Sequence, residues 1–344
     1  MEIIEIQDQD GETLDRFHEV ANRVYRGDPV WAPGSEMMFT QRFLASRTRK
    51  GRMVPVVALK NGEPLARGVA ILATGTEDKA GRRQGWIGFF EFLEEYPLAA
   101  RRVLERCEQI LRRAGAETVL APKVDNQLAG LLIKGFELPH VVWTNHNPPY
   151  YLELFTRCGY EIQTRSCTFY FTRAITEPID VHLAGFSTRE FDRSNLEEEI
   201  VVFHELQQAV FGHLPDYSPR TLQEDREMVH SVLPFLQDDL VIYAEDDEGT
   251  PVGLLVCLPD IYQALQGRKI DRVRIISIGA IPRLSHRGIG ALMGAHLMKN
   301  LIQREEYVFA EGSIVLRSNV QPQNLAKRFH AEPGREFVLL GKTL

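Results

Sequence analysis

Short apolar runs alternate along the chain with longer stretches in which apolar residues recur at helical spacing. In the first half, the runs at 54–59, 66–73 and 86–92 are bounded by turn residues, which predicts three strands. Asn61-Gly62 between the first two runs predicts a tight hairpin turn. A helical period over 98–114, stopped by a glycine, predicts a helix. The remaining patterns of this half predict a strand at 118–121, a helix at 149–158 and a strand at 168–172.

The second half repeats this order of elements. The patterns predict a strand hairpin, a long strand, a helix, a strand, a helix and a closing strand, at 240–245, 252–258, 272–281, 288–303, 307–316, 324–330 and 337–340. Two further helices are predicted before them, at about 195–210 and 219–236. The repeated order indicates an internal duplication with low sequence identity. We therefore expect two domains, 1–176 and 177–344, joined near Glu177-Pro178. Each is expected to be α/β (α+β), with a mixed, mostly antiparallel central sheet flanked by helices.

Composition and charge narrow the class of protein. With 44% apolar and 25% charged residues, the chain can bury a sizeable core. Its net charge of -7 disfavours a nucleic-acid binder, and the one basic run, Arg47–Arg52, is interpreted as a solvated helix end. No apolar stretch reaches the ~18 residues of a membrane span, and the first residues do not resemble a signal peptide. We expect a cytoplasmic protein, with peripheral membrane contact left open.

The four cysteines are scattered along the chain. They lack the spacing of metal ligands, so the sequence predicts reduced thiols and no metal site; they are Cys107, Cys158, Cys167 and Cys257.

The most informative stretch is 282–292, which follows a predicted strand and opens a predicted helix. Gly288 and Gly290 allow the backbone to approach a ligand closely at the helix start. The unpaired N–H groups of a first helical turn, together with the helix dipole, form an anion site. Arg287 adds positive charge, so the pattern predicts a bound phosphate or pyrophosphate. The alternative is a glycine-rich helix start that only packs on the sheet. Neither the P-loop nor the dinucleotide-binding pattern is present.

The strand, the turn through Arg287–Gly290 and the helix together resemble motif A of the GNAT acyltransferase superfamily, Gln/Arg-x-x-Gly-x-Gly/Ala. Ser285 stands at the first position and departs from the pattern. The stretch Glu311–Asn319 is similar to the fifth strand of that fold and the asparagine after it. Gly253–Asp260 and Asn147–Tyr151 resemble segments of tandem-GNAT bacterial proteins, and the resemblance covers nearly the whole chain. It implies acyl-CoA or coenzyme A as co-substrate and direct attack of an amine on the thioester.

The resemblance also implies where coenzyme A binds. The strands at 272–281 and 307–316 are expected to splay, with the pantetheine arm between them like an added strand. Turn amides at 286–291 are expected to hold the pyrophosphate. The implied cofactor-binding residues are Ile278, Ala280, Ile281, Ser285, His286, Arg287, Gly288, Ile289, Gly290, Ala291 and Asn319.

The sequence offers several candidates for proton transfer. The superfamily often uses a tyrosine on the last helix, but that position falls near Ala326 here. Glu311 and Ser313 are expected to face one side of their strand, and Glu311 is either a base or a structural carboxylate. His213 and Tyr217 lie in the loop between two helices that lines the acceptor pocket in GNAT folds. A histidine titrates near neutral pH, which suits a base, although an exposed loop histidine is the alternative.

The first half lacks the glycine pair. Glu91, Glu94 and Glu95 stand where phosphates would bind, and like charges repel, so this half is expected to be a degenerate copy. Its aromatic residues either line an acceptor groove or form ordinary core; they are Trp86, Trp143, Tyr150 and Tyr151.

Two functions remain open. The first is an N-acyltransferase that uses acyl-CoA or an acyl carrier protein as donor. Its acceptor would be a small polar amine, an amino acid or a lipid amine such as a sphingoid base. The second is a non-catalytic acyl-CoA-binding sensor or regulatory module. The sequence also leaves a homodimer open.

Overall fold

The computed structural model describes residues 1–6, 11–32, 53–72, 76–78, 80–126, 129–172, 179–214 and 217–344. The basic run Arg47–Arg52 and the predicted linker at Glu177-Pro178 lie outside these ranges. The chain divides into two compact units, residues 1–166 with 335–344, and residues 167–334. Both dividing points fall inside strands, so most of the last strand belongs to the first unit. The predicted domains, 1–176 and 177–344, would instead assign the whole of this last strand to the second domain.

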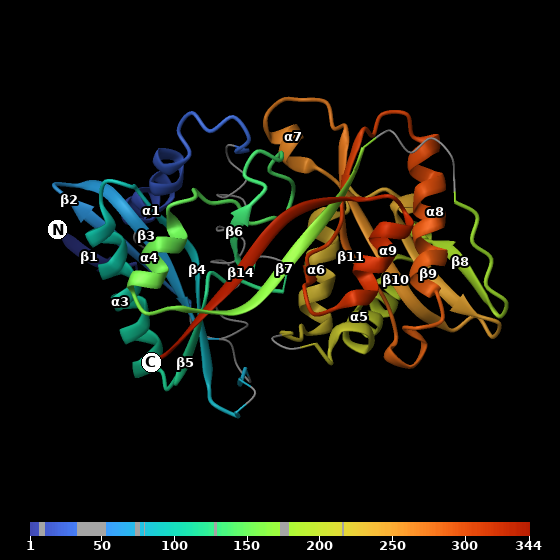
Figure 1. Ribbon diagram of the computed structural model, residues 1–344, viewed down its shortest axis with the longest axis horizontal. Coiled ribbons are helices and arrows are strands. Elements are labelled where there is room, and N and C mark those ends of the chain that lie inside the picture. The colour runs from blue at the N-terminus through green and yellow to red at the C-terminus, as the bar shows by residue number, and fades with distance from the viewer. Residues whose placement is uncertain are drawn as a thin grey trace. The chain divides into compact units, whose positions relative to one another are not determined.

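The first unit contains a sheet in the order β1-β2-β3-β4-β5-β14, with β6 paired to β14 (Figure 1). Its strands are β1 (Glu2–Glu5), β2 (Met53–Lys60), β3 (Glu63–Ile71), β4 (Gln84–Phe92), β5 (Thr118–Ala121), β6 (Leu131–Lys134) and β14 (Glu332–Thr343). Its helices are α1 (Gly11–Val24), α3 (Pro97–Arg113) and α4 (Tyr151–Arg157). Of the strand pairs described in this unit, only β4 and β5 are parallel.

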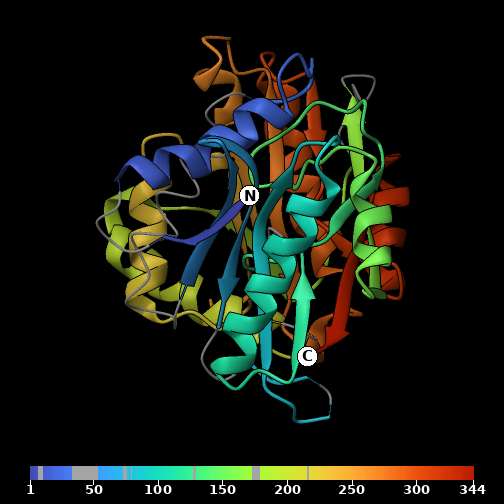
Figure 2. The same cartoon turned by 90° about the vertical axis from the view of Figure 1, so that its left-hand side faces the viewer.

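Helices α1 and α3 cover opposite faces of this sheet. Arg67 on β3 donates to the carbonyl of Phe17 on α1 at 3.3 Å. A Cβ added at the next residue, Gly68, would lie 3.1 Å from Val103 on α3. Successive strand residues point to opposite faces, so the two helices enclose the strands from both sides (Figure 2). Trp86, Trp143 and Tyr151 are buried, which fits ordinary core rather than a groove.

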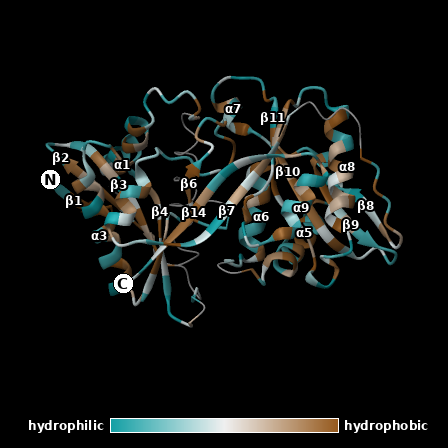
Figure 3. Cartoon of the chain, in the orientation of Figure 1, coloured by the Kyte–Doolittle hydropathy of each residue, from teal (hydrophilic) through white to brown (hydrophobic). Residues whose placement is uncertain are grey.

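The second unit contains a sheet in the order β7-β12-β11-β10-β9-β8, with β13 paired to β7. Its strands are β7 (Glu161–Thr172), β8 (Phe186–Glu190), β9 (Val241–Asp246), β10 (Pro251–Pro259), β11 (Arg272–Ala280), β12 (Phe309–Glu311) and β13 (Val315–Leu316). Its helices are α5 (Leu196–Phe211), α6 (Leu222–Val232), α7 (Ile261–Leu265), α8 (Ile289–Gln303) and α9 (Val320–Arg328). Apolar residues gather on the central strands and polar ones on the outer sides of the helices (Figure 3).

The expected fold class is confirmed, because each unit has a mostly antiparallel sheet flanked by helices. Two expected elements near the site differ. The single strand expected at 307–316 is two short strands interrupted at 312–314, and α9 begins at Val320 rather than at residue 324. Within the described ranges, none of the helices combines the length and the apolar character that crossing a bilayer requires.

Candidate functional site

Strands β11 and β12 of the second unit pair over only part of their length. They pair in parallel at Arg272–Arg274 and Phe309–Glu311, after which β12 ends and β11 continues to Ala280. Just beyond Arg274, a bulge interrupts the pairing of β11 with β10, because Ser277 pairs with Val256 whereas Ile275 pairs with Cys257. The extra residue, Ile276, bends the strand away from its neighbour. A wedge therefore opens between the two strands, where the resemblance implied that they splay.

The bulge also decides which side chains face which helix. Ser277 faces α5, where its hydroxyl accepts a hydrogen bond from Gln207 Nε2 at 3.1 Å. Gly279 faces the same helix, because a Cβ there would lie 2.5 Å from Val210. Ile278 points to the other face and packs with the core on the α8 side, as Ala280 and Ile281 do. The expected cofactor strand is thus placed at the wedge, with its alternate residues on two different faces.

The turn between β11 and α8 exposes backbone amides and basic side chains together. Arg283, His286 and Arg287 are exposed. Gly288 caps α8 with φ 90°, and its carbonyl accepts from the amides of Ala291 at 2.9 Å and of Leu292 at 3.1 Å.

In the part of the chain that the structure describes, the amides of Gly288, Ile289 and Gly290 donate to no backbone carbonyl. Such amides at a helix N-terminus, next to exposed cations, suit an anion. Ser285 uses its hydroxyl within the turn, donating to the carbonyl of Pro282 at 2.9 Å. The serine at this position of the motif is therefore compatible with the backbone conformation of the turn.

The two motif glycines are needed for different reasons. Gly288 has a positive φ, and a Cβ there would meet nothing within 4 Å. Gly290 has no such strain, but a Cβ would lie 3.3 Å from Leu325 on α9. One turn later, a Cβ on Gly294 would lie 3.0 Å from the ring of Phe329. The packing alternative therefore applies to Gly290, although its partner is α9 rather than the sheet.

Helix α9 adjoins the same turn. Gln321 Nε2 lies 2.5 Å from His286 Nδ1. Asn319 precedes this helix, and its carbonyl accepts from Gln323 Nε2 at 3.0 Å, while its side chain makes no capping bond. The turn and the start of α9 are therefore joined, which brings Asn319 into the neighbourhood that the resemblance implied.

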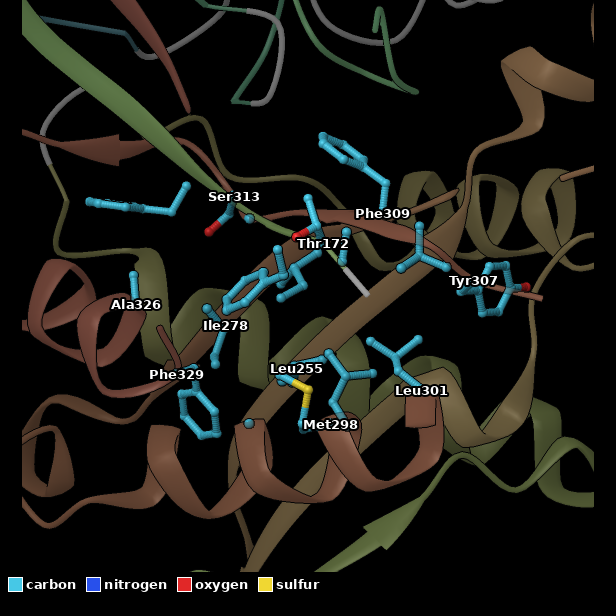
Figure 4. Close-up of a pocket in the computed structure, with 18 of the residues that line it drawn as sticks. Thr172, Leu255, Ile278, Met298, Leu301, Tyr307, Phe309, Ser313, Ala326 and Phe329 are labelled. Carbon is cyan, nitrogen blue, oxygen red and sulfur yellow. The ribbon is translucent and has the colours of Figure 1, made fainter. Parts of the chain in front are cut away.

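A cavity of about 340 Å³ lies between the sheet, α8 and α9 (Figure 4). Its lining comes from β7, β10, β11, β12, α8 and α9 and is mostly apolar; it includes Leu255, Ile278, Met298, Leu301, Ala326 and Phe329. Ala326, near the position at which the superfamily often has a tyrosine, lines the cavity with its small side chain.

Glu311 and Ser313 do not share one environment. Glu311 is completely buried and accepts a hydrogen bond from the Thr168 hydroxyl at 2.7 Å, whereas Ser313 lines the cavity. The expectation that both face one side assumed a continuous strand, but β12 ends at Glu311 and the alternation does not continue. The contacts of Glu311 are those of a structural carboxylate.

His213 and Tyr217 lie beyond the end of α5, on either side of residues 215–216, which are outside the described ranges. His213 is exposed, as the alternative interpretation held. Tyr217 is half-buried, and burial raises the pKa of its phenol above the usual value, with Asp225 adding to the effect and Arg220 opposing it. A phenol with a raised pKa stays protonated at neutral pH, so Tyr217 can donate a proton but is a poor base.

Sequence reasoning missed a histidine–aspartate pair on the α5–α6 side of the sheet. His204 Nδ1 lies 2.8 Å from Oδ2 of Asp225 on α6, and Asp225 is 1% exposed. Arg220 Nε donates to the other carboxylate oxygen. The other ring nitrogen, Nε2, lies 2.8 Å from Gln208 Nε2. A histidine held on both sides keeps a fixed ring orientation. His204 lies one helical turn before Gln207, which reaches Ser277 at the bulge. The pair joins two helices, so no local pattern could have indicated it.

The first unit has the same strand arrangement but a filled wedge. Strands β4 and β5 pair in parallel only at 84–86 and 118–120. Beyond that point the Lys123 amide donates to the carbonyl of Ile87 at 2.9 Å. A Cβ on Gly88 would lie 2.6 Å from Val124 and 2.8 Å from the Lys123 carbonyl oxygen. The chain itself thus occupies the space that the wedge leaves open in the second unit.

Glu91 differs from its expected place near a phosphate. It is buried, and it accepts hydrogen bonds from the hydroxyls of Tyr25 at 2.9 Å and Tyr151 at 2.6 Å. Glu94 and Glu95 are exposed just before α3, where they oppose the binding of an anion.

No family model matches the chain. Two named proteins are similar over much of it, each 23% identical. One is Protein YghO of Escherichia coli, with 96% of this chain and 93% of that protein covered. The other is a bacterial ceramide synthase of Caulobacter vibrioides, with 74% and 70% covered.

Solved structures agree on the fold. A tandem GNAT protein from the clavulanic acid biosynthesis pathway has a TM-score of 0.63 at 13% identity and covers 99% of this chain and 98% of its own. A GCN5-related N-acetyltransferase from Sphaerobacter thermophilus has a TM-score of 0.60 at 16% identity, covering 99% and 95%. The chain therefore has the tandem GNAT fold, and the resemblance noted from the sequence is confirmed at the level of fold.

Proposed function

We propose that the protein is an N-acyltransferase that binds acyl-CoA in its second unit and transfers the acyl group to an amine. The observation that carries the proposal is the amide-rich, basic turn at 285–291 beside the wedge between β11 and β12. Beyond Arg274, β11 is paired with β10 alone among the described strands, so its other edge can accept a strand-like pantetheine arm. The residues proposed to hold coenzyme A are those implied by the resemblance: Ile278, Ala280, Ile281, the turn residues 285–291 and Asn319.

In this proposal the amine nitrogen forms a bond to the thioester carbonyl carbon, and the carbon–sulfur bond breaks. The amine must lose a proton and the thiolate must gain one. His204, oriented by buried Asp225, is proposed as the base, with the exposed His213 as the second candidate. Tyr217 is proposed as a proton donor, because its phenol is protonated at neutral pH. Positioning of the amine beside the thioester supplies much of the remaining acceleration.

We further propose a lipid amine, such as a sphingoid base, as the acceptor. Two observations support this choice over a small polar amine. The similar Caulobacter protein is named a ceramide synthase. The cavity beside the wedge is also lined mostly by apolar side chains, which suits hydrocarbon better than a polar molecule.

A non-catalytic acyl-CoA sensor is the second candidate. The alanine at position 326, where the superfamily often places a proton-donating tyrosine, favours it. An acyl carrier protein as donor would use the same pantetheine arm and the same wedge.

The test follows the release of free thiol from acetyl-CoA and from hexadecanoyl-CoA, with and without added amines. Glycine, putrescine and sphinganine represent the acceptor classes. The proposal predicts thiol release that depends on the amine and is greatest with sphinganine. Binding of acyl-CoA without release for any amine would favour the sensor instead. Release with acyl carrier protein alone would change the donor.

A further inference from the structure

The residues that line the cavity in the second unit are spread along α8, from Gly294 to Ile302. In Figure 4 Ala326, Phe329 and Ser313 stand toward one end, and Leu301 and Tyr307 stand at the other. Met298 and Leu255 lie between the two ends, along α8 and the sheet. The cavity therefore extends well along α8, away from the anion-binding turn at the start of that helix.

The chemistry of the wall selects an apolar occupant. The middle of the cavity is lined by aliphatic and aromatic side chains. Two of the polar groups at the far end have other partners, and a third, Glu305, is exposed to solvent. Arg304 donates to Asp239 at 2.6 and 2.8 Å, and the Tyr307 hydroxyl donates to Gln237 at 2.8 Å. A polar or charged ligand buried here would lose its water without gaining matching hydrogen bonds.

The near end of the cavity is continuous with the wedge. Ile278 from the free part of β11 and Gly312 and Ser313 from the break after β12 all line it. A ligand in the cavity can thus place one end beside the site proposed for the thioester. The opposite end would lie against Leu301 and Tyr307.

We propose that this cavity holds the linear hydrocarbon chain of a lipid substrate, with its reactive end near Ser313 and its terminal methyl near Leu301. The identity of the reaction rests on the proposed function, whereas the binding of the hydrocarbon chain does not. The hydrocarbon chain belongs either to the acyl donor or to the long-chain amine. Each added methylene that reaches apolar wall should raise affinity about fourfold until the chain meets Leu301.

Binding of the chain is tested without coenzyme A. The probe is cis-parinaric acid, a fluorescent polyene fatty acid, displaced by saturated fatty acids of increasing length. Leu301→Trp fills the far end of the cavity. Leu265→Trp adds the same side chain on α7, where Leu265 is exposed and does not line the cavity. We expect Leu301→Trp to weaken long chains at least tenfold while leaving short ones nearly unchanged, and Leu265→Trp to match the native protein.

Ala326→Phe narrows the near end and provides a second variant if Leu301→Trp fails to fold. Retained binding of coenzyme A identifies a folded variant. The proposal is overturned if the native protein binds no probe, or if both cavity variants bind long chains as the native protein does. Probe binding without any acyl transfer would leave the cavity assignment standing while the proposed function fails.

Two kinetic series distinguish the source of the chain. One varies the acyl chain of the donor with a fixed short amine, and the other varies the amine with acetyl-CoA. Leu301→Trp should depress the long-chain rates in only one series, which identifies the occupant. An unchanged chain-length dependence in both series would contradict the proposal.

Discussion

At the scale of single residues, the contacts of the candidate groups lead us to propose His204 as the base ahead of the residues expected from the sequence. Glu311 is buried against Thr168, and Ser313 faces the apolar cavity, so neither lies in an environment suited to a base. His204 instead combines partial exposure with a fixed carboxylate partner. The sequence could suggest histidines by their chemistry alone, but it could not indicate which one had an aspartate 21 positions away beside its ring.

His204→Gln is predicted to lower kcat by roughly 10²- to 10⁴-fold, the range for loss of a general base. Binding of acyl-CoA should be unaffected, because His204 lies on the α5–α6 side rather than at the turn. Steady-state kinetics with calorimetric binding distinguishes the two effects. His182→Gln, at an exposed histidine outside the proposed site, is the matched control and should retain activity. An unchanged kcat in His204→Gln would exclude this residue as the base.

Asp28 in the first unit has a pH-dependent effect on stability. Burial alone would raise the pKa of its carboxyl, but hydrogen bonds from His146 and from the amides of Val30 and Trp31 lower it overall below its usual 3.8. The stabilising effect is then present above about pH 3.8 and is lost as the pH falls through the lowered pKa. Asp28→Asn should lower Tm at pH 7, and the difference should shrink below pH 3.8. A Tm difference that grew with acid would contradict this assignment.

At the scale of elements, hydrophobic periodicity predicted the central strands and the major helices. Thr118–Ala121 matches β5, and the other central strands and α8 agree to within a few residues. The break after Glu311 was missed because apolar residues resume at Ile314, so the interruption by Glu311-Gly312-Ser313 was included in one strand. The early start of α9 was missed because Asn319 makes no capping bond and Pro322 lies inside the first turn. These irregular points surround the candidate site, where ligand geometry competes with regular pairing.

The contact between α5 and β11 depends on a glycine. Gly279→Ala would place a Cβ 2.5 Å from Val210, so α5 would have to move. We expect a loss of roughly 1–3 kcal/mol in unfolding free energy, the usual cost of overpacking, together with reduced activity through displacement of Gln207. Gly11→Ala, where a Cβ meets nothing within 4 Å, is the control for urea denaturation. Equal stability of the two variants would contradict this prediction, because it would mean that α5 shifts to accommodate the Cβ at no cost in free energy.

At the scale of the whole molecule, two copies of one topology differ at the wedge, which is filled in the first unit and open in the second. The repeated order of elements predicted the duplication. The missing glycine pair predicted that the first copy is degenerate. It did not show that the segment at 123–124 fills the first wedge, because that contact depends on how the chain folds back on β4. The boundary at residue 176 remains a prediction about folding domains, since the compact units exchange the ends of two strands.

Calorimetric titration of the native protein and of Arg287→Glu with coenzyme A tests the central claim most directly. The structure leads us to expect one site per chain, because one wedge is open and the other is filled. Reversing the charge at the turn should weaken binding roughly tenfold or more, which corresponds to the loss of a charge-assisted hydrogen bond. Leu265→Trp, far from the turn in sequence and exposed on α7, should bind as the native protein does. Absence of binding to the folded native protein, or equal affinity in Arg287→Glu, would contradict the assignment of the coenzyme A site.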